Sequence, residues 1–484
     1  MIEQFYDLKP QVLELDRKTL ELCRDQFAHL EEIRDYNQLK MLRAFTDCGV
    51  EARHFLGSTG YGVWDDSRNK LEEVFSRCMG AEDALVRPQF MSGTHTLTVA
   101  LFGLLRAGDT LLAATGRPYD TLEGVIGIGE AGKGCGTLQE YGIHYDEVPL
   151  LPDFTPDYAA IAEHAKTATV VHIQRSRGYT QRNAFDLDTI QKVADTARKA
   201  NPDVVIFVDN CYGEFTQIRE PLSAGADVIA GSFIKNPGGG ITPTGGYIAG
   251  KADLVEKISH RFTAPGIGKD LGCTQDSLRD TFLGFYYAPG VVCEALKTAV
   301  YAQCLLELVG VNPVPRYTAD HNDIVTCFDS GSAAALQGFC AGIQSCSPVD
   351  SFVSPEPADE PGYTDQVIII LRIQNQSSSS SSVASDAYWL KNLLGIFLTI
   401  TYAIANAIAL SIRFSIIEEE NTETMISLVA AIRVAVTTEV PVTPVAPPYT
   451  KMVIREAEIV LVREQANQVR ITPQIFLKKP ALTI

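Results

Sequence analysis

Three short segments of the sequence combine residue types that can bind an anion, hold a buried charge or act as a nucleophile. They span residues 90–96, 204–214 and 228–240. Each segment contains or follows a run of apolar residues typical of a buried strand. Because ligands bind at the carboxyl ends of the strands in a parallel sheet, these are the first places to look for a functional site.

The first segment, FMSGTHT, follows a β-rich run at 84–87 and opens an apolar helix. Ser92, Gly93 and Thr94 offer hydroxyl groups and backbone N–H groups at the start of that helix. Such a helix N-terminus can bind a phosphate. The alternative is an ordinary N-cap, which has the same residue types.

The second segment places Asp209 directly after the apolar run 204–208. A carboxylate at the end of a buried strand needs a cationic or protonated partner, because a lone buried charge is very costly. The alternative is an aspartate that caps the next helix.

The third segment places Lys235 after the run 228–230, with Ser232 before it and three glycines at 238–240. A lysine at a buried strand end can have a lowered pKa and act as a nucleophile, and the glycines would let a flat ligand approach. The alternatives are a surface lysine before a turn, or a glycine-rich phosphate loop. No G-x-G-x-x-G follows the first strand and no G-x-x-x-x-G-K-[ST] is present, which disfavours a dinucleotide or nucleoside triphosphate.

The order of the three segments is more specific than any one of them. A phosphate-type helix start, then an aspartate, then a lysine, each at a strand end, is what a pyridoxal 5′-phosphate site needs. The lysine would hold the aldehyde as an imine, and the aspartate would keep the pyridine nitrogen protonated. The helix start and its hydroxyl groups would hold the phosphate.

The elements needed to position these residues are visible as alternating patterns. Short β-rich runs recur, separated by helical segments such as 94–106 and 187–200, and residues 12–45 have helical periodicity. The β-rich runs are 84–87, 110–114, 167–173, 204–208, 228–230 and 246–249. This alternation predicts an α/β fold with a mostly parallel sheet sandwiched by helices.

The charge and the cysteine content limit which partners the protein can have and in which cell compartment it is expected. The chain has 41 basic and 59 acidic residues and a net charge of −18, which disfavours a nucleic-acid partner. Its 11 cysteines are irregularly spaced and none has zinc-finger spacing, so we predict reduced thiols and no metal site. Acidic residues begin at the third position and no apolar leader follows, so a cytoplasmic protein is expected.

The composition changes near residue 363. Of the 37 glycines, 36 lie before it. Residues 374–382 form a polar, serine-rich run that is typical of a linker. Residues 393–412 carry no charge and are long enough to span a bilayer. A membrane contact is thus possible, but a buried helix is favoured.

Over residues 1–370 the sequence resembles fold-type I pyridoxal phosphate enzymes of cysteine and methionine metabolism. More narrowly, it is similar to the methionine gamma-lyase-like group often called aluminium resistance proteins. The segments that carry the resemblance are 55–62 with Asp65 and Arg68, 89–96, 173–179, 208–215, 231–240, 263–269 and 347–353.

The resemblance implies roles for individual residues. Lys235 would form the Schiff base and exchange the substrate's α-proton, Asp209 would pair with the pyridine nitrogen, and His95 would stack on the ring. The residues that would hold the phosphate are Ser92, Gly93, Thr94 and Ser232.

Further roles concern the substrate and a second subunit. Tyr61 and Arg68 would complete the phosphate site of a neighbouring subunit, which implies a homodimer or homotetramer. Arg175 and Arg177 could bind the carboxylate of an amino-acid substrate. For these two arginines, phosphate binding and interface pairing remain open.

The resemblance also predicts the division of the chain. Residues 1–55 would form an N-terminal helical segment, 56–290 the large cofactor-binding domain, and 291–370 the start of a smaller C-terminal α+β domain. Residues 371–484 form an atypical tail, because the family's small-domain strand and its carboxylate-binding arginine motif are not found there.

The implied activity is that of a carbon–sulfur lyase, which eliminates a thiol from a sulfur amino acid of the cystathionine or methionine type through an imine with Lys235. Other pyridoxal phosphate chemistry on the same fold remains open, such as aldol cleavage, desulfuration or racemisation. The altered tail also leaves open a catalytically inactive cofactor-binding protein or a membrane-attached protein.

Overall fold

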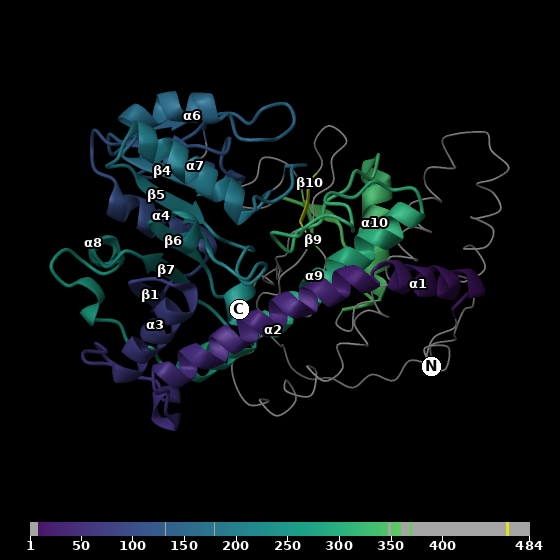
Figure 1. The fold of residues 1–484 in the computed structure, drawn as a ribbon, viewed down its shortest axis with the longest axis horizontal. Helices are drawn as coiled ribbons and strands as arrows, with labels where there is room; N and C mark the ends of the chain where they lie inside the picture. The colour runs from purple at the N-terminus through teal and green to yellow at the C-terminus, as the bar shows by residue number, and fades with distance from the viewer. Residues whose placement is uncertain are drawn as a thin grey trace, which may run out of the picture.

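The computed structural model describes residues 8–130, 132–178, 180–346, 350–359, 367–369 and 461–463 (Figure 1). These residues form a large α/β unit, seen at the left of Figure 1, and a helical part with a small sheet, seen at the right. The predicted linker at 374–382 and the uncharged run at 393–412 lie outside the described residues. Within the described part of the chain, no helix is both long and apolar enough to cross a membrane.

The centre of the large unit is a seven-stranded sheet in the order β1-β7-β6-β5-β4-β2-β3. Five neighbouring strands, from β6 to β3, are parallel, whereas β7 is antiparallel to both β6 and β1. The strands are β1 (Asp83–Arg87), β2 (Thr110–Ala113), β3 (His144–Glu147), β4 (Val170–Gln174), β5 (Val205–Asp209), β6 (Val228–Ser232) and β7 (Gly246–Gly250). The predicted mostly parallel sheet is confirmed, and β5 and β6, which end at Asp209 and Ser232, lie side by side in its centre.

Helices cover both faces of this sheet, as the alternation of strands and helices predicts. They are α3 (Asp66–Met79), α4 (Gly93–Leu104), α5 (Asp120–Ile126), α6 (Tyr158–His164), α7 (Leu187–Ala200) and α8 (Ala252–Phe262). Side chains of β5 alternate between the two faces. Ile206 and Val208 pack in the cluster that contains α3 and α7, whereas Phe207 packs in the cluster that contains α4 and α8.

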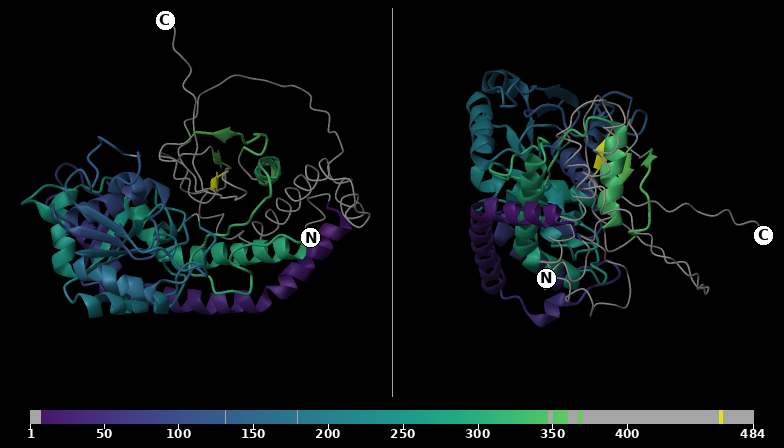
Figure 2. Two further views of the ribbon diagram at one scale, coloured as in Figure 1. Left: turned by 90° about the horizontal axis from the view of Figure 1, so that it is seen from above. Right: turned by 90° about the vertical axis from the view of Figure 1, so that its right-hand side faces the viewer.

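Helices from distant parts of the sequence lie side by side (Figure 2). They are α1 (Pro10–Leu22), α2 (Arg24–Asp47) and α9 (Leu278–Leu308). Lys297 on α9 pairs with Glu31 on α2 at 2.9 Å, and the Cys293 thiol donates to the Leu30 carbonyl. The predicted division at 290/291 falls inside α9, so a boundary there would cut one continuous helix.

The rest of the described chain is short. Helix α10 (Ala333–Ser345) packs near an antiparallel sheet in the order β10-β9-β8, formed by β8 (Pro357–Ala358), β9 (Val367–Ile369) and β10 (Leu461–Arg463). Strand β10 comes from the segment predicted as an atypical tail. The 3₁₀ turns are η2 (Ala52–Phe55), η3 (Ala165–Thr167), η4 (Pro221–Ala224), η5 (Asn236–Gly238) and η6 (Gly268–Asp270).

Candidate functional site

The three predicted segments meet at one edge of the sheet. Strands β5 and β6 are parallel neighbours and end at Asp209 and Ser232, and α4 begins at the same edge. A Cβ atom placed on Gly93 would lie 3.6 Å from Lys235 Nζ, 3.6 Å from Ser232 Cβ and 3.3 Å from Cys211 Sγ. The helix start, the end of β6 and the lysine therefore face one small space, and Gly93 leaves it open because it has no side chain.

Lys235 is the partly buried cation of this space. Its Nζ lies 3.9 Å from the centroid of the Tyr212 ring. Burial by itself lowers the pKa of the Lys235 ammonium, but the acidic groups of Cys211, Tyr212, Tyr119 and Asp209 outweigh burial and hold that pKa well above its ordinary value. Without a cofactor, this lysine is therefore an ammonium ion held among acidic groups.

Asp209 is buried at the end of β5, and its Oδ1 accepts a hydrogen bond from the Cys211 backbone N–H at 3.0 Å. On the neighbouring strand, burial lowers the pKa of His172 to about 4, although the charge of Asp209 acts in the opposite direction. The imidazole of His172 is therefore neutral near pH 7. The alternative of a helix cap does not apply, since no long helix follows Asp209 in the segment up to Pro221.

The start of α4 has both features that its sequence offered, an N-cap and free N–H groups for an anion. Ser92 is the N-cap, because its Oγ accepts a hydrogen bond from the His95 N–H at 3.1 Å. Among the described residues, no acceptor faces the N–H groups of Gly93 and Thr94, as expected for the first turn of a helix. The structure thus gives Ser92 a capping role and leaves two N–H groups available to an anion.

The other two candidates near the lysine are already engaged. His95 is half-buried, its Nδ1 accepts from the Met91 N–H at 3.2 Å, and burial lowers its pKa, so its proton lies on Nε2. Ser232 is fully buried and its Oγ accepts from the Ile234 N–H at 3.3 Å. Ser232 lies beside Gly93, and the roles of His95 and Ser232 toward a cofactor stay predictions.

Tyr61 and Arg68 have opposite environments. Tyr61 is 81% exposed. Arg68 is buried, and its guanidinium donates to the carbonyl oxygens of Gly62 at 2.6 Å, Gly272 at 3.0 Å and Asp270 at 3.4 Å. Arg68 therefore ties two loops of its own chain together, whereas Tyr61 is accessible to a second subunit; the role of both at a phosphate stays a prediction.

Arg175 is engaged by groups of its own chain, and its predicted substrate role stays a prediction. Its side chain is completely buried. One guanidinium nitrogen donates to Asn210 Oδ1 and the Gly213 carbonyl, both at 2.8 Å, and the other donates to Thr216 Oγ1 at 3.2 Å and Gln217 Oε1 at 3.0 Å. This arginine supports the turn that follows Asp209, because its acceptors belong to residues 210–217.

Arg177 is likewise buried and paired. Its guanidinium donates to the Val314 carbonyl and lies 3.7 Å from Asp323 Oδ2, which also accepts from Ser176 Oγ at 2.8 Å. Arg177 is therefore engaged within the protein, and its role at a substrate carboxylate stays a prediction. Its charge is used to join the end of β4 to the segment that follows α9.

Three residues that the sequence analysis did not select also line the site. They are Tyr119, Cys211 and Tyr212, whose acidic groups face Lys235. Tyr119 OH lies 3.0 Å from Thr94 Oγ1. The rule that ligands bind at the carboxyl ends of strands could have found Tyr119, because it lies in the loop between β2 and α5.

A buried polar network supports the turn after Asp209. Tyr247 OH donates to Glu214 Oε1 at 2.8 Å, and Asn210 donates to Tyr247 OH and to Glu220 Oε2, both at 3.3 Å. Burial raises the pKa of Glu214 to about 8, so its carboxyl group is mostly neutral at pH 7. The network therefore positions the turn without placing a further full charge beside Lys235.

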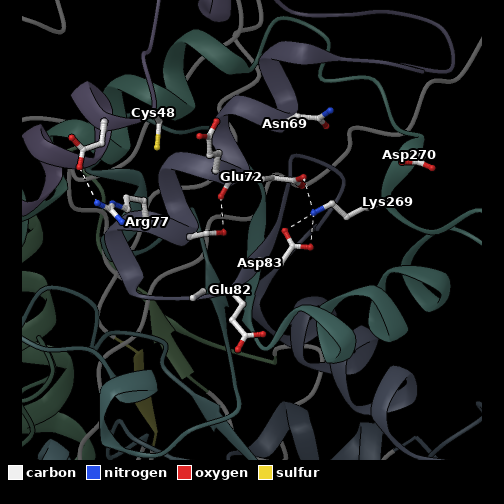
Figure 3. Close-up of a pocket in the computed structure, with 12 residues that line it drawn as sticks. Cys48, Asn69, Glu72, Arg77, Glu82, Asp83, Lys269 and Asp270 are labelled. Carbon is white, nitrogen blue, oxygen red and sulfur yellow. Dashed lines mark hydrogen bonds and ion pairs between the residues drawn. The ribbon is translucent and has the colours of Figure 1, made fainter.

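A separate pocket of about 580 Å³ lies between α3, β1 and η6 and contains none of the predicted site residues (Figure 3). Three of its acidic side chains, those of Asp47, Glu72 and Asp83, are paired with cations. Lys269 Nζ lies 2.7 Å from Asp83 Oδ2 and 3.7 Å from Glu72, and Arg77 pairs with Asp47 at 2.9 Å. These ion pairs connect neighbouring segments of the fold, which accounts for the charged residues of the pocket. We therefore assign the functional site to the sheet edge at Lys235.

The residues at the sheet edge fit pyridoxal phosphate. The two N–H groups at the start of α4 suit a phosphate. The space beside Gly93, which a Cβ would occupy, adjoins Lys235 Nζ, and the buried Asp209 can pair with a protonated ring nitrogen. A mostly parallel sheet with helices on both faces and this set of residues defines the class of fold-type I pyridoxal phosphate enzymes.

Comparison with known proteins names the family. The sequence profile of the methionine gamma-lyase family matches residues 12–389, so the chain belongs to that family. Protein YnbB of Bacillus subtilis is 42% identical over 341 residues, which are 70% of this chain and 81% of the relative.

Solved structures agree in fold. The carbon–sulfur lyase involved in aluminium resistance from Clostridium novyi is 40% identical, with a TM-score of 0.75 over 82% of this chain and 97% of that chain. The pyridoxal-5′-phosphate-dependent protein YhfS of Escherichia coli is 15% identical, with a TM-score of 0.53 over 78% of this chain and 97% of that chain. The second likeness concerns the fold alone.

Proposed function

We propose that this protein is a pyridoxal phosphate-dependent carbon–sulfur lyase that eliminates a thiol from a sulfur amino acid. The observation that carries the proposal is the meeting of Lys235, Asp209 and the start of α4 at one edge of the sheet. Membership of the methionine gamma-lyase family and the likeness to a carbon–sulfur lyase support the reaction class.

The residues of the site have distinct proposed tasks. Lys235 Nζ holds the cofactor aldehyde between turnovers and takes the substrate's α-proton during turnover. Asp209 holds a proton on the pyridine nitrogen, the N–H groups of Gly93 and Thr94 bind the phosphate, and His95 packs against the ring. When bound, the cofactor would supply an electron sink for the electron pair of the broken Cα–H bond, so that the carbon–sulfur bond can break and release the thiol; addition of one water then gives the 2-oxo acid and ammonia.

The first test is chemical trapping. The purified protein should carry a yellow chromophore that borohydride reduces and fixes to Lys235, as located by peptide mass spectrometry. Lys235→Ala should lack the fixed product. Lys251→Ala is the matched control, because Lys251 pairs with Asp227 away from the site and its loss should change nothing in the trapping. A reducible chromophore that persists in Lys235→Ala contradicts the assignment.

The same preparations test the reaction class. Incubation with cystathionine, methionine, cysteine and homocysteine should release thiol, 2-oxo acid and ammonia in equal amounts for at least one substrate. Release of an aldehyde from β-hydroxy amino acids instead would identify aldol cleavage. A trapped chromophore without turnover of any amino acid would identify an inactive cofactor-binding protein.

We also propose that two or more copies of the chain associate near Tyr61. Exposed apolar side chains close in sequence to Tyr61 and to Ser92 support this, because Trp64 is 90% exposed and Met91 is 74% exposed. Sedimentation equilibrium should give a homodimer or homotetramer, and Trp64→Ser should weaken the association. A monomer at micromolar concentration would exclude a subunit-shared site.

A further inference from the structure

The turn after Asp209 holds two large residues, Tyr212 and Phe215, in a backbone conformation that such residues rarely adopt. Tyr212 has a φ of +69°, in the left-handed region that costs an L-residue about 1–2 kcal/mol. The surrounding contacts fix this conformation. Cys211 N–H donates to Asp209, and Gly213 N–H donates to the Asn210 carbonyl at 2.9 Å.

The space around the turn leaves the chain few alternatives. A Cβ on Gly213 would lie 2.6 Å from Arg175 Cδ, so the backbone there is packed against the buried arginine. Strain of this kind persists where neighbouring structure enforces it and is found most often at functional sites. The conformation directs the ring of Tyr212 at Lys235, whose Nζ lies 3.9 Å from the ring centroid.

We propose that Tyr212 is a positioning residue whose ring face holds Lys235 in its ammonium form beside the reacting carbon. An ammonium at this distance from an aromatic face is attracted by the negative charge density of the ring, and the attraction is strongest where water is excluded. The inference rests on the proposed function, because it assigns the ring a task in that reaction.

The task concerns the state in which the Lys235 amine would be free to accept the substrate's α-proton. The Cα–H bond of the substrate breaks, its electron pair stays with the substrate carbon and its conjugated system, and the proton adds to Lys235 Nζ. The amine thereby becomes an ammonium ion. The Tyr212 ring stabilises that ion and keeps the proton near the carbon or leaving group that receives it next.

Other groups also face this ammonium and have to be separated from the ring. They are Asp209 and Cys211 after β5, Tyr119 from the loop before α5, Glu214 from the following turn, and the phenol of Tyr212 itself. A test must therefore distinguish the aromatic face of Tyr212 from its hydroxyl group and from the neighbouring acids.

The test uses the full-length protein freed of cofactor and does not depend on turnover. Trace acetic anhydride at pH 9 labels a lysine in proportion to its unprotonated fraction, and Lys251 on the surface is the internal standard. In Tyr212→Leu, Lys235 should be labelled about tenfold faster than in the wild type, which corresponds to a pKa lower by about one unit. In Tyr212→Phe the labelling rate should stay within a factor of two of the wild type.

Each result decides the inference. Equal acceleration in the Phe and Leu variants would show that the hydroxyl group holds the ammonium, and no acceleration in either would show that the ring does not; both overturn the proposal. Tyr212→Met serves as a second ringless variant if the Leu variant does not fold. If borohydride traps nothing on wild-type Lys235 but the labelling shift is seen, the proposed function fails and the contact stands. If trapping succeeds without the shift, only this inference fails.

Discussion

Asp209→Asn should lower kcat/KM for thiol release by about a thousandfold, which is the upper range for loss of one preorganised electrostatic group. Asparagine has the same shape and can still accept the Cys211 N–H bond, so the turn should keep its conformation. It carries no charge, and so it cannot hold a proton on the pyridine nitrogen. The cofactor should then still bind, with borohydride trapping on Lys235 retained, while the α-proton is removed far more slowly.

A matched control is available at the opposite edge of the sheet. Asp227 directly precedes β6, is also buried, and pairs with Arg198 at 2.7 Å and Lys251 at 2.8 Å. Asp227→Asn should reduce stability but leave kcat/KM within a few-fold of the wild type. Similar rates for the two variants would show that a buried charge matters only for folding and that Asp209 has no role in the reaction.

The sequence was sufficient to predict the central strands because each is a short apolar run buried on both faces. Strand β3 (His144–Glu147) was missed, since it lies at the sheet edge and its polar residues are only partly buried. The antiparallel direction of β7 was not predicted either. It follows from the connection after β6, which contains only the short turn η5 and no crossover helix.

The candidate site, too, could be predicted from the sequence only in part. Asp209, Lys235 and the start of α4 could be predicted, because residues at the carboxyl ends of parallel strands must share one edge of the sheet. The environments of Arg175 and Arg177 could not. Their acceptors lie 35 or more residues away in the sequence, so only the folded chain shows that both guanidinium groups are buried and engaged.

The ion pair of Arg177 and Asp323 carries the largest expected effect on stability. Both side chains are 1% exposed, and Asp323 also accepts hydrogen bonds from Ser176 Oγ at 2.8 Å and the Arg177 N–H at 3.1 Å. Asp323→Ala should lower the free energy of unfolding by about 3–5 kcal/mol, because it leaves a buried guanidinium without its anion. Unfolding in guanidinium chloride measures this loss, and the slope of the free energy against denaturant concentration should not change.

Two further variants separate the charge from the hydrogen bonds. Ser176→Ala removes one hydrogen bond that Asp323 accepts, and it should lower the free energy of unfolding by only about 1 kcal/mol. The double variant Arg177→Met with Asp323→Ala removes both charges and should be more stable than Asp323→Ala alone, because no unpaired ion remains. Additive losses in the double variant would mean that the two side chains do not act as a pair. Since the pair joins the end of β4 to the segment after α9, coupling would show that the sheet edge carrying the site is stabilised by the C-terminal half of the chain.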